Sequence, residues 1–393
     1  MKVLTNCRLV PELVEGYSGQ MADIAMDGAY IEGIYPCGQA PAGESMDMKG
    51  NTVLPGLLEL HVHANFDTMN IPAIKHRSDG QCLVDGLSYY QDYLRNGYTF
   101  IRECGVMNYQ SQYLRQIIDK GLAMGPHIQT SGACNTPTTR GNEAFGNVYK
   151  EFDGADQALK IVREDMAHGC DFIKYMVTGA MMNEGGDPGA MICTKEELQA
   201  VVDAAAELGT YVACHCHGKK GILACLETGV GTIEHATYLD EECIAQFLAY
   251  GNRSALIPTM GIQFSMAENL AGNTPEYMQK KTSAIYMKSV DHFRKAYDAG
   301  VRIGWGADMD RPTFDLFPGL EFRARALMGL TPVQLLKMAT IDSAKIIHMD
   351  EKCGTIKAGK WADLVVIEGN PDEDISAMYK LPLHVIKEGK QFC

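Results

Sequence analysis

Eight short apolar runs alternate with helix-like stretches along the middle of the chain, and this alternation restricts the folds available to it. The runs are residues 53–64, 98–104, 127–132, 171–178, 211–217, 232–236, 254–260 and 301–308. The amphipathic stretches between them include 156–168, 194–208, 218–228, 240–250 and 275–299. Repeated strand–helix units predict an α/β fold, and eight of them over roughly 300 residues fit a (β/α)8 TIM barrel. A doubly wound open sheet is the alternative, but no Gly-x-Gly-x-x-Gly motif follows any run.

The two ends of the chain follow a different pattern. Residues 1–54 contain short β-prone segments separated by glycines, and the tail is similar. Neither end is long enough to bury a good core by itself. We therefore expect residues 1–54 and 355–393 to pair into one composite β-sandwich domain, and residues 55–354 to form a catalytic barrel.

The composition argues against several classes of partner. Lys plus Arg number 35 and Asp plus Glu 49, a net charge of −14 without a basic run, so no nucleic-acid partner is expected. The N-terminus lacks the apolar core of a signal peptide and no run reaches 18 apolar residues, so no membrane partner is expected. The 13 cysteines are scattered without a Cys-x-x-Cys pair, which predicts free, mostly buried thiols in a reducing cytoplasm.

Histidines occur in pairs at the ends of two apolar runs. The first run ends with His61 and His63, and the fifth with His215 and His217. Residues two apart in a strand point to the same side, so each pair can present two imidazoles to the barrel interior. The cysteines beside the second pair point the other way. Two neutral imidazoles a few ångströms apart can chelate a divalent ion, although one His-x-His is common by chance.

Three further residues of metal-binding type lie in other runs: Lys174 in the fourth, His235 in the sixth and Asp308 at the end of the eighth. A lysine inside an apolar strand is costly unless it is neutralised or paired. A neutral amine can react with CO2, and the carbamate that forms is an anionic oxygen ligand able to bridge two metal ions. Alone, each residue has an ordinary explanation as a core histidine, a snorkelling lysine or a helix cap.

Together, these residues predict a metal site, because in a barrel the ends of the strands meet at one mouth. The other six histidines have helical or loop contexts without such partners, and we interpret them as structural. They are His76, His127, His168, His292, His348 and His384.

The sequence motifs around these residues resemble those of the amidohydrolase superfamily, and the resemblance covers essentially the whole chain. Residues 53–61 resemble its Leu-Pro-Gly opening motif, and residues 354–365 resemble its closing β-sandwich segment. The ligand set is similar to that of the binuclear subtype with a carboxylated lysine. The pattern at residues 215–218 and 233–235 resembles the branch of Xaa-Pro dipeptidases, zinc-dependent arginine carboxypeptidases and ochratoxinase.

The resemblance implies a site with two divalent ions, expected to be Zn2+, and a small-molecule substrate. The implied ligands are His61, His63, Lys174 as a carbamate, His215, His235 and Asp308. The first histidine pair and Asp308 would hold the buried ion, and the other two histidines the exposed one. A hydroxide between the ions would attack an amide carbonyl, and Asp308 would pass its proton to the departing amine. Relatives also form homo-oligomers, so a homo-oligomer is expected.

Two residues are candidates for substrate contact. The resemblance implies that His217 contacts a substrate carbonyl or carboxylate, whereas the alternative is an ordinary histidine near a helix N-terminus. Residues 138–141 depart from the Gly-Gly-His stretch of relatives, and residues 178–180 from their Thr-Gly-Gly. Arg140 in the first of these segments either binds a substrate carboxylate in bidentate fashion or is a surface arginine.

Three functions are compatible with these patterns. The first is a dipeptidase- or carboxypeptidase-like enzyme, a binuclear metal-dependent amidohydrolase that cleaves an amide or peptide bond in a dipeptide or N-acyl amino acid. The second is a mononuclear deaminase or cyclic-amide hydrolase acting on a heterocycle. Such relatives usually lack the lysine and carry a glutamate soon after the fifth-strand histidine, whereas here the first carboxylate after His215 is Glu227. The third is a non-enzymatic interaction platform, but such proteins lose ligands, and this chain keeps all six.

Overall fold

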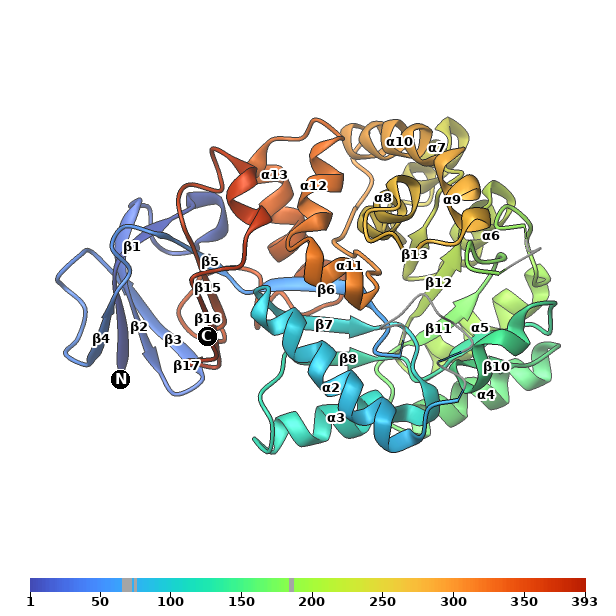
Figure 1. Cartoon of the computed structure of the whole chain (residues 1–393), viewed down its shortest axis with the longest axis horizontal. Coiled ribbons are helices and arrows are strands. Elements are labelled where there is room, and N and C mark those ends of the chain that lie inside the picture. The colour runs from blue at the N-terminus through green and yellow to red at the C-terminus, as the bar shows by residue number, and fades with distance from the viewer. Residues whose placement is uncertain (66–72, 74–75, 184–186) are drawn as a thin grey trace.

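The structure is a computed structural model that describes residues 1–65, 73, 76–183 and 187–393. Figure 1 shows a small β domain at one end, which holds both chain termini, and a larger α/β domain beside it. None of the helices in these ranges combines the length and the apolar content needed to cross a bilayer.

The β domain is one eight-stranded sheet built from the two ends of the chain. Its order is β17-β16-β15-β5-β1-β2-β3, and β4 pairs with β1. The strands are β1 (Lys2–Leu9), β2 (Met21–Asp27), β3 (Tyr30–Tyr35), β4 (Glu44–Asp47), β5 (Thr52–Pro55), β15 (Leu364–Ile367), β16 (His384–Lys387) and β17 (Lys390–Gln391). The two ends meet where β15 pairs antiparallel with β5. Side chains from both ends, such as Leu9, Ile24 and Ile386, share one buried apolar cluster.

The α/β domain contains eight parallel segments in a ring. They are β6 (Leu57–Val62), β7 (Tyr98–Glu103), β8 (His127–Thr130), β11 (Ile173–Met176), β12 (Val212–Cys216), β13 (Thr232–His235), β14 (Ala255–Ile257) and the extended residues 301–308. Asp171 N, just before β11, donates to Thr130 O of β8 at 2.8 Å. Residues 301–308 pair with β14, and Leu60 N of β6 donates to Trp305 O at 3.0 Å, which closes the ring. The predicted TIM barrel is confirmed.

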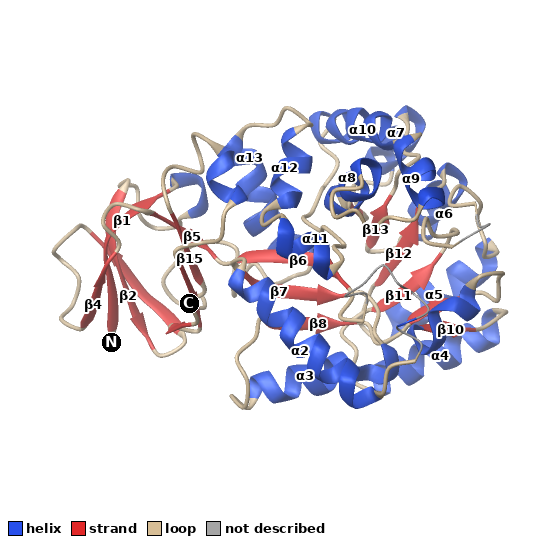
Figure 2. Ribbon diagram, viewed as in Figure 1, coloured by secondary structure: helices blue, strands red, loops and turns tan. Residues whose placement is uncertain are grey.

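Helices surround these strands, as Figure 2 shows in blue around red. They are α2 (Asp79–Arg95), α3 (Gln110–Asp119), α4 (Ala155–Ala167), α5 (Lys195–Glu207), α6 (Lys219–Thr228), α7 (Glu241–Ala249), α8 (Met260–Glu268), α9 (Glu276–Ser283), α10 (Tyr286–Asp298), α11 (Arg311–Leu316), α12 (Leu320–Ala326), α13 (Pro332–Lys337) and α14 (Ser343–Ile346). Short helical turns are η1 (Pro11–Leu13), η2 (Met107–Tyr109), η3 (Asn142–Val148), η4 (Met338–Asp342) and η5 (Ile375–Tyr379). Two short strands extend the sheet beside β11: β9 (Cys134–Thr136) pairs with β11, and β10 (Tyr149–Glu151) pairs with β9.

Local sequence explains where several helices begin. A capping box starts α5, because Glu197 N donates to Thr194 Oγ1 at 3.1 Å and Thr194 N donates to Glu197 Oε2 at 2.8 Å. The amphipathic stretch 275–299 forms two helices, α9 and α10. At the end of α9, Ser283 Oγ donates to Ala267 O at 3.1 Å, which ties this helix to α8. Helix α8 in turn lies beside the cavity described next.

Candidate metal centre

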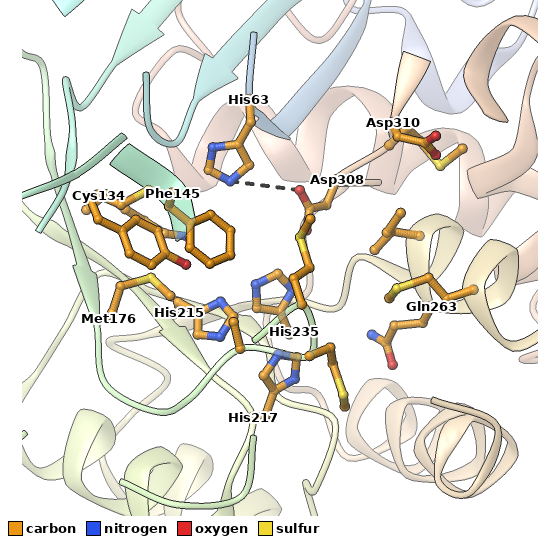
Figure 3. A pocket seen from close by; sticks show the side chains of 18 residues that line it. His63, Cys134, Phe145, Met176, His215, His217, His235, Gln263, Asp308 and Asp310 are labelled. Atoms are coloured by element: carbon orange, nitrogen blue, oxygen red, sulfur yellow. Dashed lines mark ion pairs between the residues drawn. The ribbon is translucent and has the colours of Figure 1, made fainter. Parts of the chain in front are cut away.

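A cavity of about 740 Å3, including its open mouth, lies at the carboxyl ends of the barrel strands. Figure 3 shows histidines and carboxylates from several strands that face one another across it. Six of the seven candidate residues at the strand ends line this cavity: His63, Lys174, His215, His217, His235 and Asp308. The seventh, His61, lies directly behind them and is fully buried.

The first group joins the strand-one histidines to the tip of strand eight. His61 Nε2 and His63 Nε2 are 3.2 Å apart. Asp308 Oδ1 lies 3.9 Å from His61 Nε2 and 3.8 Å from His63 Nε2. Lys174 Nζ lies 3.5 Å from His61 Nε2. The structure therefore brings these four candidate ligands together around one point.

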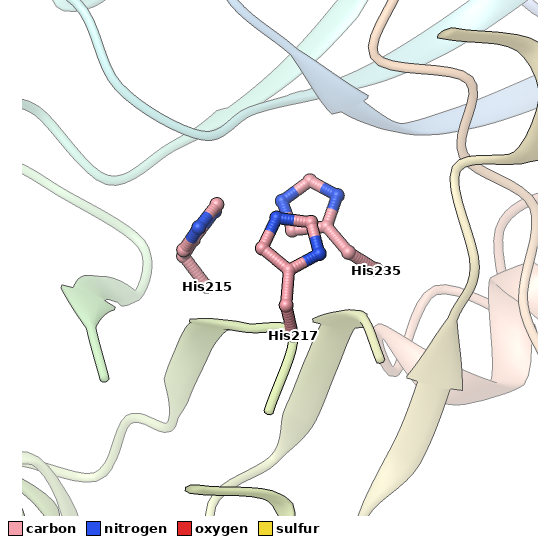
Figure 4. A group of neighbouring side chains, drawn as sticks. All are labelled: His215, His217 and His235. Carbon is pink, nitrogen blue, oxygen red and sulfur yellow. The ribbon is translucent and has the colours of Figure 1, made fainter. Parts of the chain in front are cut away.

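The second group consists of the histidines of strands five and six, shown in Figure 4. Ring nitrogens of His215, His217 and His235 all lie within 4.8 Å of one another. The ring centroids of His215 and His235 are 4.5 Å apart, and the ring centroid of His217 lies 4.7 Å from each of them. His217 is thus nearly as close to the other two rings as they are to each other.

Hydrogen bonds fix the tautomers of the strand-one histidines. His61 Nδ1 lies 2.7 Å from Glu234 Oε2, and His63 Nδ1 lies 2.9 Å from the Gly105 carbonyl oxygen. Because that carboxylate and that carbonyl accept, both Nδ1 atoms donate, and both Nε2 atoms carry lone pairs. Two lone pairs that face each other at 3.2 Å repel unless a cation lies between them. This arrangement fits a metal site.

The other imidazoles are held in the same way. His215 Nε2 lies 3.2 Å from Gly179 O, and His235 Nδ1 lies 2.7 Å from Thr259 Oγ1. Thr259 donates onward to a backbone carbonyl, so it accepts from His235. Each ring thus keeps one unprotonated nitrogen, which is what coordination requires. His217 Nδ1 lies 2.7 Å from Thr237 Oγ1, which leaves its Nε2 free.

Burial keeps these rings neutral. Burial, and next the charge of Lys174, lowers the pKa of His63 to about 3, and the same two causes lower the pKa of His217 to about 3. Burial raises the pKa of the Asp308 carboxyl to about 7. A nearby cation would favour the ionised carboxylate and leave the imidazoles as lone-pair donors.

Lys174 is 1% exposed on the central strand β11. Among the described residues, no carboxylate lies within 4.0 Å of its amine, and its only hydrogen-bond partner there is His61 Nε2. A buried ammonium without a counter-charge is strongly disfavoured. Its amine thus lies inside the candidate ligand cluster, at the position that the predicted carbamate requires.

Backbone strain marks the strand ends that carry the site. His235 and Asp308 have φ values of 68° and 55°, and Thr259 has 48°. Residues other than glycine rarely adopt this left-handed region, which costs on the order of 1–3 kcal/mol each. The surrounding barrel holds this conformation, which lets the side chains turn into the cavity.

A fully buried ion pair lies behind His61. Arg102 donates from Nη2 to Glu234 Oε1 at 2.7 Å, from Nη1 to Thr232 Oγ1 at 2.9 Å and from Nε to Leu60 O at 2.6 Å. Glu234 therefore accepts from the guanidinium with one oxygen and from His61 with the other. Arg102 is not among the site residues that the sequence patterns predict. Its position inside an apolar run is a signal that could have identified it, because a charge inside an apolar strand needs a partner.

Substitution of Glu234 by glutamine is expected to weaken metal binding. The variant Glu234→Gln keeps an oxygen for Arg102 but replaces the acceptor of the His61 Nδ1 proton by an amide donor. Loss of such an orienting hydrogen bond typically lowers metal affinity about 10- to 100-fold. Competition with a chromophoric chelator measures this change. Glu207→Gln, an exposed position on α5, is the control, and equal affinity in both variants would show that Glu234 does not orient the ligand.

The remaining predicted residues lie elsewhere. Arg140 is exposed and does not line the cavity, and its contact with a substrate carboxylate stays a prediction. Of the histidines interpreted as structural, His127 stacks on Trp361 at 3.9 Å and His168 on Tyr109 at 4.0 Å. None of those six lines the cavity.

Comparison with known proteins agrees with the barrel fold described above. The model of the amidohydrolase family matches residues 52–392. The ochratoxinase of Aspergillus niger is 28% identical over 380 residues, which cover 86% of this chain and 75% of that protein. A prolidase solved with N-methylphosphonate-L-proline is 26% identical with a TM-score of 0.89, over 99% of this chain and 98% of the other. A Xaa-Pro dipeptidase solved with methionine in its active site is 26% identical with a TM-score of 0.86, and the match covers 100% of this chain and 99% of the other.

Proposed function

Because this chain belongs to the amidohydrolase family, we propose that it is a binuclear metallohydrolase that cleaves the amide or peptide bond of a dipeptide or an N-acyl amino acid. The convergence of lone-pair nitrogens on one cavity, with a buried lysine and an aspartate between them, is the observation that carries this proposal. The prolidase, dipeptidase and ochratoxinase relatives support the choice of a peptide or amide substrate.

The proposed ligands are those of the two groups, with Zn2+ as the expected ion. His61, His63 and Asp308 would hold one ion and His215 and His235 the other, with Lys174 as the bridging carbamate. Bound ions of this kind polarise the substrate carbonyl and supply a water nucleophile at neutral pH.

Two side chains have proposed roles in the reaction. Asp308 Oδ1 lies among the ligand atoms and opens to the cavity, so it can take a proton from the nucleophile and give it to the departing amine. His217 is proposed to donate from Nε2 to the substrate carbonyl or carboxylate. This role requires the tautomer in which Thr237 Oγ1 donates to His217 Nδ1 at 2.7 Å instead of to Gln263 Oε1 at 3.5 Å. This assignment keeps His217 out of the ligand set although it lies among the other histidines.

The cellular setting is also a proposal. All 13 cysteines are free, and all but Cys37 and Cys393 are buried, which supports a reducing compartment such as the cytoplasm. Assembly into a homo-oligomer stays a prediction from the family resemblance.

A substrate panel tests the proposed function. The zinc-loaded protein is mixed with dipeptides and N-acyl amino acids, and the released amine is measured. We expect turnover that disappears on treatment with a chelator and returns with Zn2+. If the protein instead turns over only cyclic imides or aminated heterocycles, it is the alternative deaminase or cyclic-amide hydrolase, and the proposal is wrong.

A further inference from the structure

We propose that Glu103 is a positioning residue for His63, an inference that rests on the metal site of the proposed function. Glu103 is the last residue of β7 and is fully buried. It does not line the cavity, and its Oε1 lies 3.8 Å from His63 Nδ1. Its effect on the His63 ring therefore passes through the backbone groups that its carboxylate holds.

The carboxylate joins the ends of two neighbouring strands. The last residue of β6 accepts a backbone hydrogen bond from Cys104 N of the β7 side at 2.7 Å. Beyond this bond, Glu103 Oε2 accepts from Ala64 N at 2.7 Å, and Glu103 Oε1 accepts from Gly105 N at 3.0 Å. One carboxylate thus holds both the residue that follows His63 and the residue whose carbonyl accepts from the His63 ring.

The position of Gly105 decides where that ring lies. His63 Nδ1 donates to Gly105 O at 2.9 Å, which turns Nε2 toward the other candidate ligands. Gly105 has a φ of 151°, and a Cβ atom there would lie 2.1 Å from Cys134 Sγ and 3.2 Å from His63 Cε1. The backbone of Gly105 therefore packs directly against the ring, and a displacement of this backbone moves the ligand.

A third donor fixes the carboxylate itself. Tyr90 on α2 is fully buried, and its hydroxyl donates to Glu103 Oε2 at 2.7 Å. A buried carboxylate is costly without donors, and three donors on its two oxygens offset that cost. Outer partners of this kind orient a histidine ligand and set its metal affinity. The connection from Tyr90 through Glu103 to Gly105 is therefore suited to holding His63 in one orientation.

The variant Glu103→Gln tests this role. It keeps the length of the side chain but presents an amide donor to one of the donors that the carboxylate accepts from. We expect its affinity for Zn2+, measured by competition with a chromophoric chelator, to fall about 10- to 100-fold. With Co2+ in place of Zn2+, we expect its visible absorption bands to shift, because these bands report the ligand geometry of the ion.

The matched control is Asp165→Asn. Asp165 on α4 is another fully buried carboxylate, and it accepts from the Tyr109 hydroxyl at 2.8 Å but does not line the cavity. This variant should lose stability and keep the Zn2+ affinity and Co2+ spectrum of the unmodified protein. Unchanged affinity and spectrum in Glu103→Gln, or equal losses in Asp165→Asn, would overturn the proposed role.

A milder pair of variants decides the question if Glu103→Gln does not fold. Tyr90→Phe keeps the carboxylate and removes one donor, so we expect about two- to tenfold weaker Zn2+ binding. Tyr109→Phe removes the equivalent hydroxyl from Asp165 and should bind Zn2+ as the unmodified protein does. Equal Zn2+ affinity in these two variants would overturn the role of Glu103.

These measurements are separable from the test of the proposed function. If the unmodified protein binds Zn2+ but hydrolyses no amide, the proposed function is wrong, and the Zn2+ affinities of the variants still decide the role of Glu103. If the unmodified protein does not bind Zn2+, both proposals are wrong.

Discussion

The variant Lys174→Ala is expected to lose at least about a thousandfold in kcat/KM and to bind fewer than two metal ions per chain. The reason is electrostatic. The amine lies 3.5 Å from His61 Nε2 inside the ligand cluster, and its carbamate would supply the one anionic group shared by both ions. Without it, two dications stand in a buried site with their mutual repulsion uncompensated. Steady-state kinetics and metal analysis of the purified variant measure both effects.

A chemical rescue distinguishes a lost ligand from a damaged fold. A short carboxylate such as acetate can enter the space left by the side chain and supply an anionic oxygen, so it should restore part of the activity of Lys174→Ala. The exposed Lys220→Ala on α6 is the matched control and should behave like the unmodified protein. Full activity of Lys174→Ala without any added carboxylate would contradict the assignment of this lysine.

The variant Asp308→Asn is expected to keep most of its metal but to lose about a thousandfold in kcat. Asparagine has nearly the same shape and retains an oxygen next to His61 and His63, so coordination can survive in part. It cannot accept and return a proton, and removal of a positioned acid–base group typically costs about 10²- to 10⁴-fold. Kinetics at saturating substrate, combined with metal analysis, separates the two contributions.

The control for this substitution is Asp203→Asn at an exposed position on α5. The expected pattern is a fall in kcat for Asp308→Asn alone, with little change in the metal content of either variant. If Asp308→Asn retains both its metal and its kcat, another group must carry the proton, and Asp308 serves only as a ligand.

The barrel and the position of its reactive residues follow from simple sequence patterns. Strand alternation predicted that His61 and His63 share a face, and the structure places their Nε2 atoms 3.2 Å apart. Lysine in an apolar strand predicted that Lys174 is buried and near the other candidates, which is what the structure contains. These predictions succeed because parallel strands in a barrel all end at the same mouth.

The surroundings of the site could not be predicted in the same way. Arg102 and Glu234 stand on different strands, and each is recognisable from sequence only as a charge that needs a partner; the barrel register decides which partner it finds. Apolar residues that line the cavity, such as Phe145 on η3, Tyr149 on β10 and Met266 on α8, reach it through tertiary packing, which the sequence pattern does not reveal. Arg140 is a plausible residue type in a loop, and its exposed side chain leaves its contact with substrate a prediction.

The number of metal ions bound per chain tests whether the site is binuclear. The protein is loaded with Zn2+, dialysed against metal-free buffer and measured by plasma emission together with its concentration. Four imidazoles, the modified Lys174 and Asp308 should retain close to two ions in the unmodified protein and fewer in Lys174→Ala. A value near one, or near zero, for the unmodified protein would contradict the proposed binuclear site.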